Sequence, residues 1–240
     1  MDYAKEIEEL RAKFDFKSNF LFDGLGDEQI ADIKKLFEPI SFSKGNKLFY
    51  EDGIPTGVFL IESGLAKKYK SVIGDYEQIF YIYAQGDLLG YHALLSDERY
   101  QDSCEAMVDV QVSFISKENF LLLLEEIPSL KLSLIKNLSH EFGVLANTIS
   151  ILAQKAQNIR LALYLLVLES RYNKFKTESE GISITREDLA NLIGATRESL
   201  GRSLKEFKDI GLIRIESKAI YLQNRNALYE LIEKKSKGDQ

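Results

Sequence analysis

Residues Ile184–Ile213 read ITREDLANLIGATRESLGRSLKEFKDIGLI and have the spacing of two short helices joined by a tight turn. Thr185, which comes three residues before an aspartate, is typical of a helix N-cap. Gly194 supplies the turn that ends this first helix, and Thr196 is the expected N-cap of the second. The small residue Ala190, a glycine four residues later and a leucine six residues after that give the pattern of a helix-turn-helix.

The second helix should bury one apolar stripe and expose polar side chains on its other side. The expected stripe consists of Leu200, Leu204 and Phe207. The exposed side then carries Arg197, Glu198 and Arg202, and in the major groove arginine can bond guanine while glutamate accepts from cytosine. Glu198 and Arg202 are also four residues apart, so an ion pair within the helix is an alternative role that does not exclude the first. Gly201 lowers helix stability, which indicates a packing or close-approach requirement.

Two alternating segments follow, at residues 212–217 and 219–223, and predict a small hairpin or wing. Residues 182–225 contain eight Lys or Arg and six Asp or Glu, which gives a net charge of +2 in a chain of formal charge −6. The basic side chains gather where the motif lies. An acidic protein can still bind DNA through such a locally basic face.

A long helix is predicted to begin after Pro128, and it carries apolar residues at alternating steps of four and three. The members of this heptad seam are Leu138, Phe142, Leu145, Ile149, Leu152, Ala156 and Ile159. Such a helix is too long for a small barrel to cover, so we expect the seam to pair with its copy in a second subunit. Packing of the helix on its own domain alone is the alternative.

Residues 40–117 consist of short segments rich in Phe, Tyr, Ile and Val with glycines between them, a pattern that predicts an antiparallel sandwich or barrel. Residues 1–38 are expected to form charged amphipathic helix. We predict an α+β chain of three parts. They are an antiparallel β-roll domain with N-terminal helices over residues 1–128, a dimerisation helix over 129–159 and a winged helix-turn-helix domain over 160–240.

The composition excludes several classes of protein. No apolar run approaches the roughly 18 residues of a membrane span, and the charged start shows no secretory signal, so we expect a cytoplasmic protein without a membrane partner. Cys104 is the only cysteine and cannot by itself hold an iron–sulfur cluster. The two histidines, His92 and His140, lie on a predicted loop and an outer helix face. They do not form the two-histidine and carboxylate site of a metal-dependent oxygenase, and we do not expect an enzyme.

The run Thr-Arg-Glu-x-x-Gly-Arg, the β-rich region and the long helix together resemble the Crp/Fnr family of bacterial transcription regulators, over about Phe20 to Leu222. Gly86–Gly90, which reads GDLLG, resembles the start of that family's phosphate-binding cassette in a cyclic-nucleotide-binding jelly roll. The resemblance implies a homodimer that reads a palindrome of TGTGA-like half-sites in double-stranded DNA. The residues that it implies for DNA binding are Thr185, Arg186, Thr196, Arg197, Glu198, Ser199 and Arg202. The loop Tyr172–Gly181 corresponds to a region that often touches RNA polymerase in activators.

The effector site departs from the pattern of the family's cyclic-AMP binders, in which a glutamate holds the ribose and an arginine the phosphate. The corresponding positions here hold Tyr91, Tyr100 and Gln101, with Arg99 one residue out of register. The adenine-contacting pair on the dimer helix corresponds to Leu145 and Ala146. An anionic phosphate without a fixed cation is unfavourable in a buried pocket, so cyclic AMP is not the expected effector. The candidate effector pocket comprises Gly90, Tyr91, His92, Arg99, Tyr100, Gln101, Leu145 and Ala146.

The identity of the effector stays open between an unknown small molecule, a vestigial pocket and haem held through His92. A hydrogen-bonded structural role is the alternative for that histidine. A ligand-binding module that uses the helix-turn-helix for protein contact is a further alternative to a DNA-binding regulator.

Overall fold

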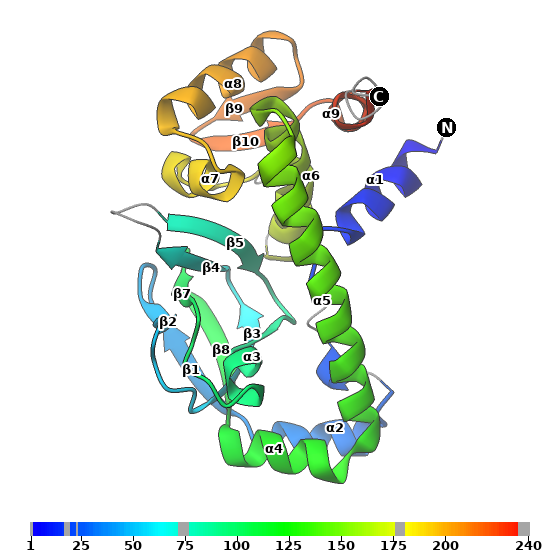
Figure 1. Ribbon diagram of the computed structural model, residues 1–240, viewed down its shortest axis with the longest axis vertical. Coiled ribbons are helices and arrows are strands. Elements are labelled where there is room, and N and C mark those ends of the chain that lie inside the picture. Colours follow the sequence, from blue (N-terminus) through cyan, green and yellow to red (C-terminus); the bar gives the residue numbers. More distant parts are fainter. Residues whose placement is uncertain (1, 17–19, 23, 72–76, 176–180, 235–240) are drawn as a thin grey trace. The chain divides into compact units, whose positions relative to one another are not determined.

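The computed structural model describes residues 2–16, 20–22, 24–71, 77–175 and 181–234. The chain divides into two compact units, one formed by residues 16–142 and the other by residues 1–15 together with 143–240 (Figure 1). This division differs from the three parts expected from the sequence, because the first fifteen residues pack with the C-terminal part of the chain.

The unit of residues 16–142 is built on two four-stranded antiparallel sheets, as predicted (Figure 1). One sheet has the order β1 (Glu38–Phe42), β8 (Val110–Ser116), β3 (Gly57–Ser63) and β6 (Leu88–Leu89). The other has the order β2 (Lys47–Phe49), β7 (Ser103–Ala106), β4 (Ala66–Ser71) and β5 (Glu77–Tyr83). Consecutive strands often lie in different sheets, which is the connectivity of a jelly roll.

One core joins these strands to the helices of the same unit, α3 (Tyr91–Leu95) and α4 (Lys117–Glu126). Val58 from β3, Ile115 from β8 and Phe120 from α4 are fully buried together. The side chain of Ser116 caps α4 by accepting a hydrogen bond from the backbone N–H of Asn119. The strand-to-helix transition is therefore fixed by local sequence.

The N-terminal region forms separate short helices, in keeping with the N-terminal helices expected from the sequence. It contains α1 (Tyr3–Ala12), the 3₁₀ turn η1 (Phe20–Phe22) and α2 (Asp27–Lys34). Gly24 adopts φ +75° between the last two, a conformation that ends regular helix and favours glycine. Leu21 and Ile33 are buried in the core of the 16–142 unit.

The long helix exists as α5 (Pro128–Gln154), but the seam does not continue along it to Ile159. Phe142, Leu145 and Ile149 are exposed, with 77%, 38% and 66% of their surface accessible. Leu138 packs against the core of its own unit. The helix ends before Ala156, and Ile159 is buried in the next helix. The seven-residue spacing of apolar residues continues past the end of α5 because α6 also has apolar residues, and these pack against its own chain.

The second unit is a winged helix-turn-helix domain built round α6 (Gln157–Phe175) (Figure 1). It contains α7 (Arg186–Ile193), α8 (Arg197–Asp209), the hairpin β9 (Ile213–Glu216) and β10 (Ala219–Leu222), and α9 (Arg225–Lys234). Residues 161–168 of α6 are all buried, because other elements of the unit pack against several sides of the helix. A helix that is apolar all round is stable only in such a setting.

Helix α1 packs on α6 and α9 through charged groups as well as apolar ones. Arg11 donates to Glu169 at 2.9 Å and to the carbonyl of Leu166 at 2.8 Å. Asp15 forms an ion pair with Arg171, of which 1% is exposed. Burial lowers the pKa of Arg171 to about 9, which leaves the guanidinium charged at neutral pH and in need of this carboxylate.

Among the described residues, no helix is long and apolar enough to cross a membrane.

Gly57 and Gly201 make a matched pair for testing the packing. A Cβ at Gly57 would overlap the carbonyl oxygen of Ile115 and the ring of Phe114, whereas a Cβ at Gly201 would meet nothing within 4 Å. We expect Gly57→Ala to lower the free energy of unfolding by at least 1–3 kcal/mol, roughly the cost of overpacking. Gly201→Ala should raise it by about 1 kcal/mol. Chemical denaturation measures both, and equal effects would contradict the close approach of β3 to β8.

Candidate functional site

The helix-turn-helix has the local structure that its sequence predicts. Thr185 caps α7 by accepting a hydrogen bond from the N–H of Asp188 at 2.9 Å, and Thr196 caps α8 by accepting from Ser199 at 3.2 Å. Gly194 between the helices is left-handed, with φ +61°. The apolar stripe of α8 is buried as predicted and consists of Leu200, Leu204 and Phe207.

The other side of α8 is open to solvent and carries Arg197, Glu198 and Arg202. Arg197 lies 3.9 Å from Glu187, an exposed pair of little energetic weight. Glu198 and Arg202 have no side-chain partner within the part of the chain that the structure describes, so the alternative ion pair between them does not form here. Gly201 opens onto this same exposed surface, where an added Cβ would meet nothing within 4 Å among the described residues. The packing reason expected for this glycine is not found in that part of the chain.

Four of the predicted DNA-contacting side chains also have roles inside the domain, among them the α8 cap Thr196. The hydroxyl of Ser199 points inward and donates to Gln157 Oε1 at 2.5 Å. The hydroxyl of Thr185 accepts a hydrogen bond from the backbone N–H of Asp188 and donates one to the carboxylate of the same residue. Arg186 is half-buried, and burial lowers the pKa of its guanidinium. Sequence position alone could not distinguish these capping and packing roles from contact with a partner.

The wing follows α8 directly. Its turn residues Ser217 and Lys218 both have positive φ, which is the geometry of a two-residue hairpin turn. Arg214 lies over the ring of Tyr221 with 4.4 Å between guanidinium and ring centroid. A backbone bridge between Ile182 and Ile220 adds a third short segment to this hairpin. The wing is thus held by contacts of its own and by the bridge to Ile182.

The candidate effector region of the 16–142 unit contains a compact polar network. Gly90, with φ +91°, begins α3, and Tyr91 is fully buried after it. Glu141 of α5 accepts from Tyr91, lies 2.5 Å from His92 Nε2 and accepts from Asn137 Nδ2 at 2.9 Å. Burial alone would raise the pKa of Glu141, but the hydrogen bond and charge of His92, with hydrogen bonds from Tyr91 and Asn137, lower it overall. Neither Glu141 nor Asn137 was predicted from the sequence as a site residue, although both lie on the buried face of α5.

Three of the other predicted pocket residues have partners within the 16–142 unit. Arg99 donates to the carbonyl of Asp52 at 2.6 Å, and Gln101 bonds to Glu98 at 2.7 Å. Tyr100 stacks on Phe49 with ring centroids 4.1 Å apart, and its burial raises its pKa to about 12. Leu145 and Ala146 are exposed on the part of α5 that belongs to the other unit.

Comparisons with known proteins agree with this architecture. Residues 39–126 match the cyclic nucleotide-binding domain family, and residues 159–231 match the Crp-like helix-turn-helix domain family. The chain belongs to the Crp/Fnr family of transcription regulators. Members of the family regulate transcription and are not enzymes.

Relatives of this Crp/Fnr regulator align over most of both chains. The fumarate and nitrate reduction regulatory protein of Vibrio cholerae is 29% identical over 88% of this chain and 83% of its own. The cyclic AMP receptor protein of Thermus thermophilus is 23% identical over 90% of this chain and 97% of its own. The structure of FixK2 from Bradyrhizobium japonicum superposes with a TM-score of 0.73 at 21% identity, covering 81% of this chain and 96% of that one.

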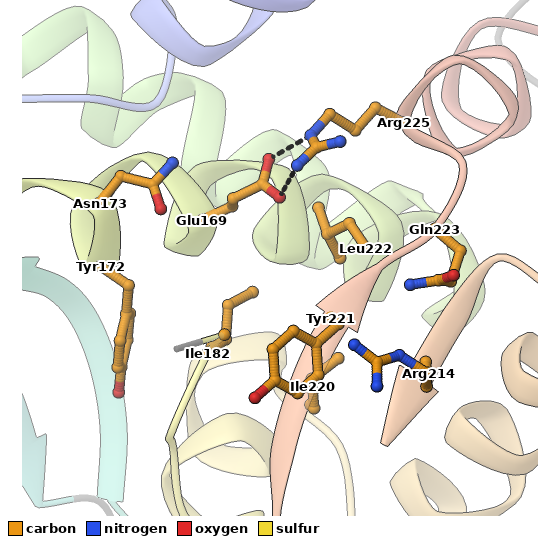
Figure 2. Close-up of a pocket in the computed structure, with 11 residues that line it drawn as sticks. Glu169, Tyr172, Asn173, Ile182, Arg214, Ile220, Tyr221, Leu222, Gln223 and Arg225 are labelled. Atoms are coloured by element: carbon orange, nitrogen blue, oxygen red, sulfur yellow. Dashed lines mark hydrogen bonds and ion pairs between the residues drawn. The ribbon is translucent and has the colours of Figure 1, made fainter. Parts of the chain in front are cut away.

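The Crp/Fnr regulator also has a pocket of about 340 Å³ between the end of α6 and the wing (Figure 2). Figure 2 shows Glu169 and Arg225 paired on one side of this pocket. The guanidinium of Arg225 donates two hydrogen bonds to the carboxylate of Glu169, from Nε at 2.8 Å and from Nη2 at 2.7 Å. Arg214, on the other side, is paired with Glu216. These lining charges are neutralised within the domain. The described residues contain no group of three or more side chains that could hold a metal ion.

Glu141 gives a pH-dependent test of the polar network. Because its pKa is lower in the folded chain than the ordinary 4.5, its charge stabilises the fold above that pH. This contribution disappears as the pH falls through the lower folded value. We expect Glu141→Gln to reduce the free energy of unfolding by on the order of 1–3 kcal/mol at neutral pH, with the deficit shrinking below about pH 4.

Urea denaturation from neutral pH to about pH 3 measures this deficit. Glu125→Gln, an exposed change in the same unit, should have little effect at any pH. A deficit for Glu141→Gln that stays constant over the whole range would contradict the charged state assigned to this carboxyl.

Proposed function

We propose that this Crp/Fnr regulator is a cytoplasmic homodimer that binds a palindrome of TGTGA-like half-sites in double-stranded DNA. The observation that carries the proposal is the exposed face of α8, where Arg197, Glu198 and Arg202 stand near the N-terminal end of a capped helix. Recognition helices enter the major groove with that end. Gly201 supports this reading, since it leaves the same face open for a closely approaching duplex.

The homodimer is proposed from the exposed apolar residues of α5. Phe142 and Ile149 are seven residues apart on one helix, and Ile135, 59% exposed, continues the series one heptad earlier. Large apolar side chains in a regular seven-residue series are typical of a helix that pairs with another helix. A second copy of the same helix supplies the matching series.

We propose that the effector is not cyclic AMP. Arg99 and Tyr100 are occupied by contacts within the β-roll, and no arginine stands at the family's phosphate position. An uncompensated phosphate would cost several kcal/mol, roughly the price of an unpaired buried charge. A haem- or other small-molecule-gated sensor of the same fold is the second candidate, with His92 as the ligand that haem would need. Its Nε2 faces Glu141, which disfavours haem.

The RNA polymerase contact implied for residues 172–181 is part of this proposal, and residues 176–180 of that loop lie outside the described residues. Tyr172, at the start of this stretch, is buried and donates to the carbonyl of Ser183.

Arg202→Ala tests the base-reading role of α8. Loss of a two-pronged arginine–guanine contact should weaken binding to the palindrome by about 1–3 kcal/mol, roughly 5–150-fold in Kd, and should relax selectivity at one base pair. Fluorescence anisotropy with the palindrome, a single-base variant and a scrambled duplex measures this. Lys208→Ala, in the exposed last turn of α8, should leave selectivity intact. Wild-type selectivity in Arg202→Ala would refute the assignment.

Ile149→Asp tests the dimer. An aspartate placed in an apolar pairing face would be desolvated without a partner, so we expect the variant to be largely monomeric where the wild type is dimeric. The adjacent substitution Ser150→Asp adds the same charge at another exposed position of α5 and should leave the dimer in place. Sedimentation equilibrium distinguishes them. If both variants associate equally well, α5 does not pair through this face.

A further inference from the structure

The junction between α5 and α6 is hydrogen-bonded to the recognition helix α8. Helix α5 ends at Gln154 and α6 begins at Gln157, so only two residues separate them. The first side chains of α6 reach α8 rather than solvent. Gln157 Oε1 accepts from Ser199 at 2.5 Å, and Gln157 Nε2 donates to Ser203 at 2.8 Å.

Asn158 extends the same network by one more turn of α8. Its Oδ1 accepts from the hydroxyl of Ser203 at 2.6 Å, and its Nδ2 donates to Glu206 at 2.9 Å. Ser199, Ser203 and Glu206 are four and three residues apart, so they form one polar row along α8. Ser203 is 6% exposed, Ser199 is partly buried and Glu206 is exposed, so this row runs from the interior of the domain to its surface.

Arg160 ties the junction to two further places. One arm of its guanidinium donates to the carbonyl of Leu152 in the last turn of α5 at 2.8 Å. Another donates to the carbonyl of Gly194, in the turn of the helix-turn-helix, at 3.2 Å. Burial lowers the pKa of Arg160, although an arginine remains charged at neutral pH. We call Gln157, Asn158 and Arg160 the junction clasp.

These contacts differ in kind from the apolar stripe next to them. Leucine and phenylalanine side chains tolerate small sliding and rotation, because dispersion contacts are not directional. Hydrogen bonds between a fixed amide and two hydroxyls are directional, and a buried polar group left unbonded is unfavourable. The junction clasp therefore selects one rotation and one register of α8 against the start of α6.

Residues 143–154 of α5 belong to the same compact unit as α8. They include Leu145 and Ile149 of the proposed pairing face. Resting on the proposed dimeric DNA-binding function, we propose that Gln157, Asn158 and Arg160 are positioning residues. They fix the direction of the recognition helix relative to the pairing face of α5, and so set the spacing between half-sites that the dimer accepts.

The test compares DNA duplexes that share two half-sites but differ by one base pair in the spacer, with the full-length protein. Gln157→Leu removes both hydrogen bonds to α8 while keeping the side chain's size. We expect it to flatten the spacing preference, so that the affinity ratio between the best spacer and its neighbours falls towards one. Lys205→Leu changes the exposed face of α8 and leaves the clasp intact. It should weaken binding equally at every spacing.

A second readout needs no DNA. Spin labels on Asp209→Cys, at the exposed end of α8, report the distance between the two recognition helices of a dimer. Cys104 is fully buried and does not compete for the label. We expect Gln157→Leu to broaden this distance distribution and Lys205→Leu to leave it unchanged. Thermal unfolding checks that each variant is folded, and Ser203→Ala, a smaller change in the same network, replaces Gln157→Leu if that variant does not fold.

The outcomes separate the two ideas. Equal loss of affinity at every spacing, or an unchanged distance distribution, would show that the clasp only stabilises the domain and would overturn the inference. A broadened distribution in a protein that prefers no palindrome would support the clasp while the proposed DNA site fails. A flattened spacing preference with a broadened distribution supports both.

Discussion

Complete burial of α6 is the constraint on which the C-terminal unit depends. Its central residues 161–168 are apolar on every side, and a helix of this kind has no stable existence in water. The elements α1, α7, α8 and α9 each contact it. The positions of the recognition helix and of the N-terminal helix are therefore consequences of one requirement, that this helix be covered.

Polar groups at the ends of α6 limit how that cover can be arranged. At its start, the side-chain amides of Gln157 and Asn158 form hydrogen bonds with the Ser203 hydroxyl of α8. Near its end, Glu169 is held by Arg11 and Arg225, while Arg171 takes Asp15. Apolar burial supplies the stability of the unit, and these directional contacts select a single arrangement of helices around it. The start of α6 is thus hydrogen-bonded to α8, and the region near its end is paired with α1 and α9.

Features set by neighbours in the sequence were predictable, and features set by distant partners were not. The caps at Thr185 and Thr196 and the left-handed Gly194 follow from a few adjacent residues, and the structure has all three. The exposed Arg197 and Arg202 follow from helix periodicity. Periodicity could not tell whether an apolar face meets its own chain, and for this reason Ile159 was wrongly added to the seam.

The inward turn of Ser199 and the partners of His92 illustrate the same limit. Each depends on one side chain placed by tertiary structure, Gln157 in the first case and Glu141 in the second. Nothing in the local sequence of either residue specifies that partner. The docking of α1 is the extreme case, because Tyr3 donates to Glu230 at a separation of 227 residues.

That last contact has a consequence for the order in which the molecule is made. Synthesis proceeds from the N-terminus, so α1 is produced before the β-roll, while α6 and α9, which contact α1, are produced after it. The β-roll of residues 16–142 is a continuous stretch and can become compact while the remainder is still being translated. The unit that carries α8 cannot, since it combines residues 1–15 with residues 143–240, and the β-roll lies between them in the sequence. A nascent chain can therefore complete the β-roll before the unit that carries α8, in which α1 packs against helices made later.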